Sequence, residues 1–263
     1  MTSLVPLDVE GRRLEVEVAW VGPPQIDPAL PVVVFLHEGL GSVAMWKDFP
    51  SRLCAAIGLR GLVYSRPGYG ASTPKSPDEH WGLDFMHLQA TRVLPALLEA
   101  LGVQQPIVLF GHSDGGSIAL IYAAMFPDRV TAAIVMAPHI LVEEFGLRSI
   151  REARTAYVTT DLRDKLARYH QDVDSAFRGW NDIWLAPEFV QWTIRDLLPA
   201  IRCRVLAIQG VDDQYGTMAQ IDGIADRVPG TQLVKLPACG HSPHRDQPQA
   251  VIDSVEALLP WGA

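Results

Sequence analysis

The sequence predicts an α/β protein built around a mostly parallel sheet. Short, β-branched apolar runs alternate along the chain with segments of helical length, which is the pattern of successive βα units. No internal repeat and no low-complexity tract interrupts this alternation. A chain of 263 residues therefore suits one large domain with an insertion better than two independent domains.

The strands can be placed in order from their apolar patterns. Residues 14–19 alternate with a period of two, which predicts a half-exposed antiparallel strand. Six further strands are expected after it, at residues 32–36, 61–64, 107–110, 132–136, 205–208 and 231–236, and the first of these is predicted to be buried. Helical segments are expected between them, including residues 83–101 and 117–126.

Residues 139–199 break this rhythm, because helical patterns and turns occur there without a convincing strand. The segment holds eight of the 21 aromatic residues of the chain. We expect a helical cap inserted into a core of residues 1–138 and 200–263. Most of these rings should pack the cap onto the core, and a few should line a pocket; the candidates for substrate contact are Trp180, Trp184 and Trp192.

The sharpest local motif is Gly111-His112-Ser113-Asp114-Gly115-Gly116, between the predicted strand at 107–110 and a helix. A G-x-S-x-G sequence in this setting is typical of a nucleophile elbow. We expect the glycines to accommodate a crowded turn and positive φ angles. The helix that begins at the turn would present free N–H groups to a developing oxyanion.

A serine needs a base, and the base needs an acid to orient it. Two acidic residues, Asp212 and Asp213, follow the predicted strand at 205–208. His241 lies in a loop after the last predicted strand. The chain order is therefore Ser, Asp, His.

With these motifs in place, the whole chain resembles the α/β-hydrolase superfamily. The resemblance rests on Phe-Leu-His-Glu-Gly-Leu-Gly-Ser at 35–42, Ser-Arg-Pro-Gly-Tyr-Gly-Ala-Ser at 65–72 and the elbow. It also rests on the Gly-x-x-Asp turn at 210–213 and on Gly240-His241 with Asp246 and Pro248 behind it. The resemblance implies an α/β-hydrolase fold, with a mostly parallel central sheet flanked by helices and an inserted helical cap.

The resemblance also implies roles for single residues. Ser113 would be the nucleophile and His241 the general base, oriented by Asp213, with Asp212 as the alternative acid. The oxyanion would be held by the backbone N–H groups of Asp114 and of Gly39, with Leu40 as the alternative to Gly39.

This sequence departs from the family at Glu38, where glycine usually follows the histidine. We expect the Glu38 side chain to point to solvent, and the Asp114 side chain to act as a carboxylate at a helix N-terminus. His112 is expected to pack without reacting, and His37 to hydrogen-bond the loop that it begins. His244 lacks the neighbours of a metal site, so neither a metal nor another cofactor is expected.

Serine at the elbow favours acyl transfer to water, whereas superfamily members that displace at alkyl carbon use aspartate there. We therefore expect a serine esterase or thioesterase acting on a small-to-medium apolar or aromatic acyl substrate. Two alternatives remain open. One is a carbon–carbon hydrolase of 2-hydroxy-6-oxo-dienoate ring-cleavage products, and the other is a non-catalytic ligand-binding member of the fold.

Composition limits the possible partners. The net charge of −8 disfavours a nucleic-acid partner. No apolar run approaches bilayer length, and the first ten residues lack the features of a secretory signal. The odd, widely spaced cysteines suit reduced thiols in a cytoplasmic protein; they are Cys54, Cys203 and Cys239. Six basic residues at 148–168 suggest either an anion-binding patch or, as we favour, a solvated helix face.

Overall fold

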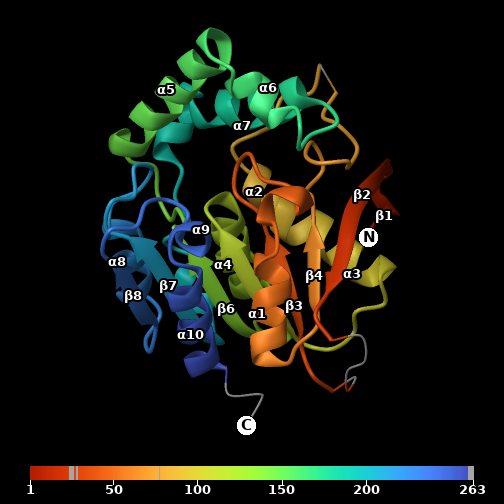
Figure 1. The fold of residues 1–263 in the computed structure, drawn as a ribbon, viewed down its shortest axis with the longest axis vertical. Helices are drawn as coiled ribbons and strands as arrows, with labels where there is room; N and C mark the ends of the chain where they lie inside the picture. Colours follow the sequence, from red (N-terminus) through yellow and green to blue (C-terminus); the bar gives the residue numbers. More distant parts are fainter. Residues whose placement is uncertain (24–26, 28, 77, 260–263) are drawn as a thin grey trace.

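A twisted sheet with helices on both faces organises the protein (Figure 1). The computed structural model describes residues 1–23, 27, 29–76 and 78–259, so the last four residues of the predicted core lie outside it. The strands are β1 (Thr2–Val9), β2 (Arg12–Val21), β3 (Val32–Leu36), β4 (Gly61–Tyr64), β5 (Ile107–His112), β6 (Val130–Met136), β7 (Arg204–Gly210) and β8 (Gln232–Leu236).

The α-helices are α1 (Phe49–Ile57), α2 (Phe85–Leu88), α3 (Leu94–Ala100), α4 (Asp114–Met125), α5 (Glu144–Thr159), α6 (Leu162–Leu166), α7 (Val173–Trp184), α8 (Ala219–Ala225), α9 (Pro243–Asp246) and α10 (Pro248–Leu258). Short 3₁₀ helices are η1 (Val43–Trp46), η3 (Pro127–Arg129), η4 (Pro187–Gln191) and η5 (Leu198–Ala200), and η2 (Gln89–Val93) is a π-helix.

The sheet confirms the predicted fold class. Within the described residues its eight strands have the order β1-β2-β4-β3-β5-β6-β7-β8. Strands β3 to β8 pair in parallel, and the β1–β2 hairpin joins them antiparallel through β4. The carboxyl ends of the parallel strands therefore meet at one edge, where ligand sites of open α/β sheets lie.

Alternating side chains of the strands supply two apolar layers. Val34, Leu36 and Leu109 face α3, α4 and α8, whereas Phe35 and Phe110 face α1 and α10. Helix α4 lies at the centre of the fold, and each of its residues from Asp114 to Ala124 is buried. The elbow at its start is therefore anchored in the densest part of the protein.

Strand β1 was not predicted from the sequence, and it contains a proline. Pro6 cannot donate a ladder hydrogen bond, which argues against a central strand. In the structure Pro6 pairs with Glu15 on the edge of the sheet, where a missing donor can face away from the ladder.

The helix predicted at 83–101 is also not continuous. It begins at Phe85, widens into the π-helix η2 and resumes as α3, which has Pro95 in its first turn. Pro95 has no N–H to donate to the carbonyl four residues earlier, and its ring would clash with that carbonyl. The wider π turn just before it accommodates both constraints.

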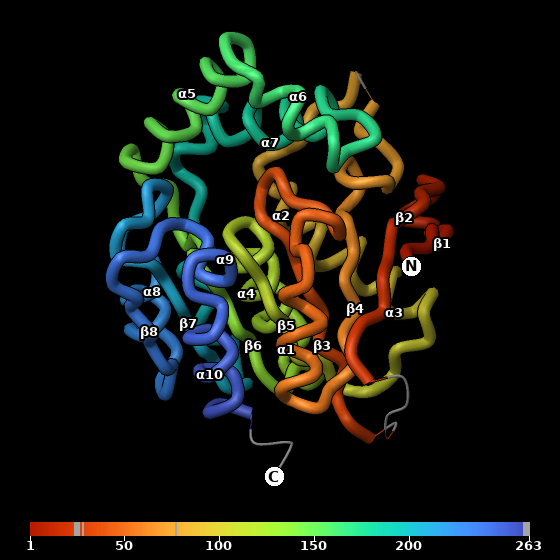
Figure 2. The backbone as a smooth tube through the Cα atoms, viewed as in Figure 1, coloured from red at the N-terminus to blue at the C-terminus, as the bar shows by residue number. Residues whose placement is uncertain are grey.

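Between β6 and β7 the chain leaves the sheet and forms α5, α6, α7, η4 and η5 (Figure 2). These helices lie above the carboxyl edge of the sheet in Figure 1. The pairing recorded among residues 139–199 is one isolated bridge between Leu141 and Thr193. We therefore propose residues 139–199 as a helical cap on a core of residues 1–138 and 200–263.

The basic segment at 148–168 lies along α5 and α6 and is largely neutralised. Arg151 pairs with Glu144 at 2.6 Å, Arg163 with Asp174 at 2.6 Å, and Lys165 with Asp161 at 2.9 Å. These exposed pairs support a solvated helix face over an anion-binding patch. In the part of the chain that the structure describes, no helix has both the length and the apolarity needed to cross a membrane.

Candidate active site

Ser113 lies at a sharp turn between β5 and α4. Its backbone has φ 54° and ψ −120°, a conformation that costs a non-glycine residue energy and persists only when the surrounding structure holds it. Gly111 and Gly115 do not share the positive φ, so this part of the expectation is wrong. Their role is close approach: a side chain on Gly115 would collide with the carbonyl oxygen of Leu36, and one on Gly111 with the carbonyl of Gly115.

Three of the predicted site residues come together as a hydrogen-bonded chain. The Ser113 Oγ lies 2.9 Å from Nε2 of His241, and Nδ1 of His241 lies 2.8 Å from Oδ1 of Asp213. They reach one another from the ends of β5, β8 and β7 respectively. The order and spacing are those of a nucleophile, a base and an orienting acid.

Asp213, and not Asp212, faces His241. Asp213 is buried and also accepts hydrogen bonds from the Tyr215 amide at 2.8 Å and from Gln209 Nε2 at 3.2 Å. Burial opposes its ionisation, but the hydrogen bond and charge of His241 outweigh this and lower the pKa of Asp213. Asp212 is exposed on the same turn.

Further aromatic side chains enclose His241. The ring of Tyr215 lies 4.7 Å from it, centroid to centroid, and the ring of His139 lies 6.0 Å from it. Burial, with the His241 charge as a smaller cause, lowers the pKa of His139 to about 3. His139 is therefore a neutral ring in the wall of the site. Sequence reasoning did not single it out, although it directly follows Pro138 at the end of a predicted strand.

The loop after β3 lies beside the elbow because of the packing of Gly115 against Leu36. His37 begins this loop and, as predicted, hydrogen-bonds to it: Nδ1–H donates to the Glu38 carbonyl at 2.7 Å, and Nε2 accepts from the Arg66 amide at 3.0 Å. Gly39 follows, directly beneath the indole of Trp180, which occupies the space that a side chain at Gly39 would need.

The amides proposed for an oxyanion are available. Asp114 is the first residue of α4, and the first N–H groups of a helix have no acceptor within it. Among the described residues, the amides of Gly39 and Leu40 also have no hydrogen-bond acceptor.

The Glu38 side chain does not point to solvent, so this expectation is wrong. It is only 17% exposed, with Oε2 lying 3.5 Å from Nδ1 of His112 and Oε1 lying 3.4 Å from Arg245. Burial opposes the ionisation of Glu38, but the interaction with His112, followed by the charge of Arg245, outweighs this and lowers the pKa of Glu38. A buried carboxylate remains ionised where such partners are present.

Asp114 stands at the N-terminus of α4, as expected, and its side chain also contacts residues outside this helix. The carboxylate is fully buried and accepts a hydrogen bond from Nε1 of Trp184 at 3.1 Å, with Arg66 3.9 Å away. Burial is the main cause that raises the pKa of Asp114 to about 6. A carboxylate of the elbow is thus bonded directly to cap helix α7.

The three tryptophans proposed for substrate contact differ in position. Trp180 covers Gly39, and Trp184 bonds to Asp114 and packs edge-on against His139 at 4.9 Å. Trp192 lies behind Trp184 in a stack with Phe189. Ser113 itself is only 6% exposed, so Trp180 and Trp184 close the site on the cap side.

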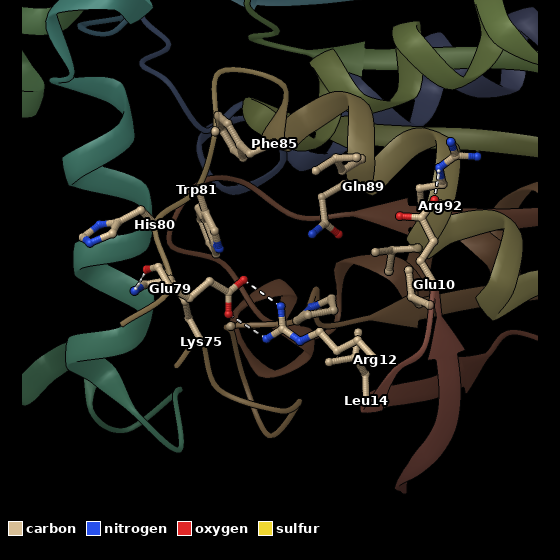
Figure 3. Close-up of a pocket in the computed structure, with 16 residues that line it drawn as sticks. Glu10, Arg12, Leu14, Lys75, Glu79, His80, Trp81, Phe85, Gln89 and Arg92 are labelled. Atoms are coloured by element: carbon tan, nitrogen blue, oxygen red, sulfur yellow. Dashed lines mark hydrogen bonds and ion pairs between the residues drawn. The ribbon is translucent and has the colours of Figure 1, made fainter. Parts of the chain in front are cut away.

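A cavity of about 230 Å³ opens elsewhere, between the β1–β2 hairpin, α2 and the loop before α2 (Figure 3). Figure 3 shows Gln89 and Arg12 pointing into it, with Trp81 and Phe85 along one wall. Arg12 is held there by two 2.7 Å hydrogen bonds to Glu79. The cavity is not lined by Ser113, Asp213 or His241.

Within the described residues, no cluster of three potential metal ligands is present.

The raised pKa of Asp114 predicts a specific pH dependence of stability. An unfolded aspartate has a pKa near 3.8, whereas the pKa of Asp114 in the folded protein is raised to about 6. The stability that this group contributes should therefore fall as the pH rises through that window, and stay low above it. Asp114→Asn cannot ionise, and its amide oxygen can still accept from Trp184.

We expect the free energy of unfolding of Asp114→Asn, relative to wild type, to increase between pH 4 and pH 7 by up to roughly 3 kcal/mol. Urea denaturation at several pH values would measure it. Asp128→Asn serves as the control, because it replaces an exposed carboxylate outside the proposed cap. It should show no such trend. A difference between Asp114→Asn and wild type that stays constant over this range would contradict the prediction.

Known proteins with similar sequences include several hydrolases. The chain is 24% identical over 236 residues to a 2-hydroxy-6-oxo-6-phenylhexa-2,4-dienoate hydrolase of Burkholderia cepacia, with 80% of each chain covered. It is 34% identical over 275 aligned positions to an sn-1-specific diacylglycerol lipase of Mus musculus, covering 89% of this chain and 82% of the relative.

Among solved structures, an esterase from Thermogutta terrifontis superposes with a TM-score of 0.72 at 21% identity, covering 99% of this chain and 98% of that one. The model of the alpha/beta hydrolase family matches residues 33–254, which include the elbow, the acidic turn and His241. The family model thus spans most of the chain, and this protein belongs to the alpha/beta hydrolase family.

Proposed function

We propose that this protein is a serine hydrolase that cleaves a carboxylic ester or thioester through an acyl-enzyme on Ser113. The observation that carries the proposal is the continuous chain of hydrogen bonds from Ser113 through His241 to Asp213, at 2.9 Å and 2.8 Å. Such a chain turns a weakly nucleophilic hydroxyl into an attacking group.

In the proposed reaction, Ser113 Oγ attacks the substrate carbonyl while His241 Nε2 takes its proton. Asp213 stabilises the imidazolium through Nδ1. The developing oxyanion accepts hydrogen bonds from the amides of Asp114 and Gly39, the latter being favoured over Leu40 on the family pattern. His241 then protonates the leaving alcohol or thiol, and a water molecule activated by His241 releases the acid.

The walls of the site favour an apolar or aromatic acyl group of small-to-medium size. Trp180 and Trp184 close the cap side, and neutral His139 adds an uncharged ring. Because these rings leave Ser113 nearly covered, a bulky acyl group would require them to move.

A second candidate is carbon–carbon bond hydrolysis of a 2-hydroxy-6-oxo-dienoate. It is favoured by the resemblance to hydrolases named for such substrates, at 24% identity. The same triad would serve this reaction, so the substrate preference decides between the two.

We further propose a cytoplasmic location and a small-molecule ester or thioester as the substrate. The three cysteines are free, and Cys54 and Cys239 are buried. Burial raises the pKa of Cys239 to about 11 and that of Cys54 to about 12, so neither thiol is a competing nucleophile.

The nucleophile can be tested with a panel of p-nitrophenyl esters, acyl thioesters and a 2-hydroxy-6-oxo-dienoate. We expect ester or thioester turnover to exceed that of the dienoate, and Ser113→Ala to lower kcat by about 10⁴-fold or more. Preference for the dienoate would favour the second candidate. Wild-type turnover by Ser113→Ala, or failure of a fluorophosphonate probe to label Ser113, would remove the serine mechanism.

The two adjacent aspartates offer a matched pair. Asp213→Asn removes the charge that orients His241 and should reduce kcat by about 10³- to 10⁴-fold. Asp212→Asn changes an exposed carboxylate on the same turn and should leave kcat within about threefold of wild type, as a surface change does. Steady-state kinetics on the best ester measures both. An equal loss in the two variants would contradict the assignment of Asp213.

A further inference from the structure

Glu38 occupies a space that the chain leaves free for it. It stands in the loop between His37 and Gly39, where the family usually has glycine. A side chain on Gly41 would bring its Cβ to 2.5 Å from Glu38 Oε2, so the absence of one at Gly41 makes room for the carboxylate. The carboxylate therefore folds under its own loop, toward the end of β5.

Two elements meet the carboxylate there. His112, the last residue of β5, has Nδ1 3.5 Å from Oε2, and Arg245 of α9 has Nη2 3.4 Å from Oε1. Arg245 also donates to the carbonyl of Met45 at 3.2 Å. Glu38 thus joins the oxyanion loop to the elbow strand and to the helix that follows His241.

The proton positions on His112 follow from its partners. Its Nε2 lies 2.7 Å from the backbone carbonyl oxygen of His241, which can only accept, so Nε2 carries a proton. If the ring were neutral, Nδ1 would carry a lone pair and would face a carboxylate oxygen. Two hydrogen-bond acceptors would then face each other with no proton between them. Nδ1 is buried, and no other group in the described chain donates to it.

We propose that Glu38 and His112 share a proton as an imidazolium–carboxylate pair, which positions the loop of His241 relative to the oxyanion loop. In the pair, Nδ1–H points to Glu38 and Nε2–H points to the His241 carbonyl. The inference rests on the proposed function, since it concerns the placement of the proposed base. Glu38 and His112 are positioning residues and do not touch the substrate.

The other ionisable groups around the pair are compatible with it. Burial opposes the ionisation of Glu38, but its contact with His112 and then the charge of Arg245 lower its pKa. His244 stays neutral because burial lowers its pKa. The remaining neighbours are His241 and His244 on the loop and helix after β8, Asp114 on α4, Arg66 after β4 and His170 before α7.

The proposed pair can be tested by the direction in which the acid limb of the pH profile shifts when Glu38 is replaced. The ring centroids of His112 and His241 lie 5.1 Å apart, so the cationic end of the pair faces His241 and disfavours its protonation. In Glu38→Gln, the amide N–H can donate to Nδ1 of a neutral His112 ring, and the cation is lost. The acid limb of kcat/KM should then move to higher pH, by at least about 0.3 unit.

If His112 were neutral in wild type, Glu38→Gln would remove only a negative charge, and the acid limb would move to lower pH. A shift downward or no shift would therefore overturn the pair. We expect kcat of Glu38→Gln to fall by about three- to tenfold with KM nearly unchanged, and Glu38→Leu, which cannot donate to Nδ1, to lose more. Glu10→Gln, which replaces an exposed carboxylate, is the control. Its kcat and its pH profile should match those of wild type.

A second measurement needs no active variant. In the ¹⁵N spectrum of histidine-labelled wild-type protein at pH 7, His112 should show two protonated ring nitrogens, assigned by loss of the signals in His112→Asn. In Glu38→Gln it should show the neutral Nε2–H form. A neutral ring in wild type would overturn the pair even if Ser113→Ala is inactive. Activity in Ser113→Ala would instead refute the proposed mechanism and leave the spectrum to decide the pair.

Discussion

The close approach of helix α4 to the end of β3 is the constraint on which the site depends. A side chain on Gly115 would collide with the Leu36 carbonyl, so the backbones of the elbow and of the chain at the end of β3 approach each other closely. That approach brings the loop that carries Gly39 beside the elbow that carries Asp114. It also explains why the positive φ at Ser113 is tolerated, since α4 is buried along its length and cannot relax away.

Around this contact, the site brings together three carboxylates that are largely shielded from solvent. Asp213, Asp114 and Glu38 are carboxylates with little exposure, and each has a different partner: His241, Trp184 and the His112–Arg245 group respectively. The environments separate their pKa values, with Asp213 and Glu38 lowered and Asp114 raised. At Asp213 and Glu38 the interactions with their partners outweigh burial, whereas at Asp114 burial outweighs the charge of Arg66 and the hydrogen bond from Trp184.

The sequence predicted what depends on local pattern and chain order. The parallel strands, the elbow and the chain order Ser, Asp, His follow from short apolar runs and from the turns that end them, whereas the choice of Asp213 over Asp212 came from the family resemblance. Strand β1 was not predicted; it contains Pro6, which is tolerated only at an edge, and edge position is a property of the whole sheet. The orientation of Glu38 depends on His112 and Arg245, which lie 74 and 207 positions further along the chain, and on the space at Gly41. The bond between Asp114 and Trp184 likewise joins parts of the chain 70 positions apart, and no local pattern contains it.

That bond also links substrate access to the reacting groups. Trp184 closes the site and at the same time donates to the residue whose amide is proposed to hold the oxyanion. Moving α7 to admit a substrate would break this hydrogen bond and leave a buried carboxylate with only a distant arginine at 3.9 Å. Loss of a hydrogen bond to a buried carboxylate is costly, so the closed arrangement is favoured unless a substrate or water replaces the indole N–H. The elbow and the cap are therefore not independent parts: the same carboxylate that begins α4 favours the position of α7 over Ser113.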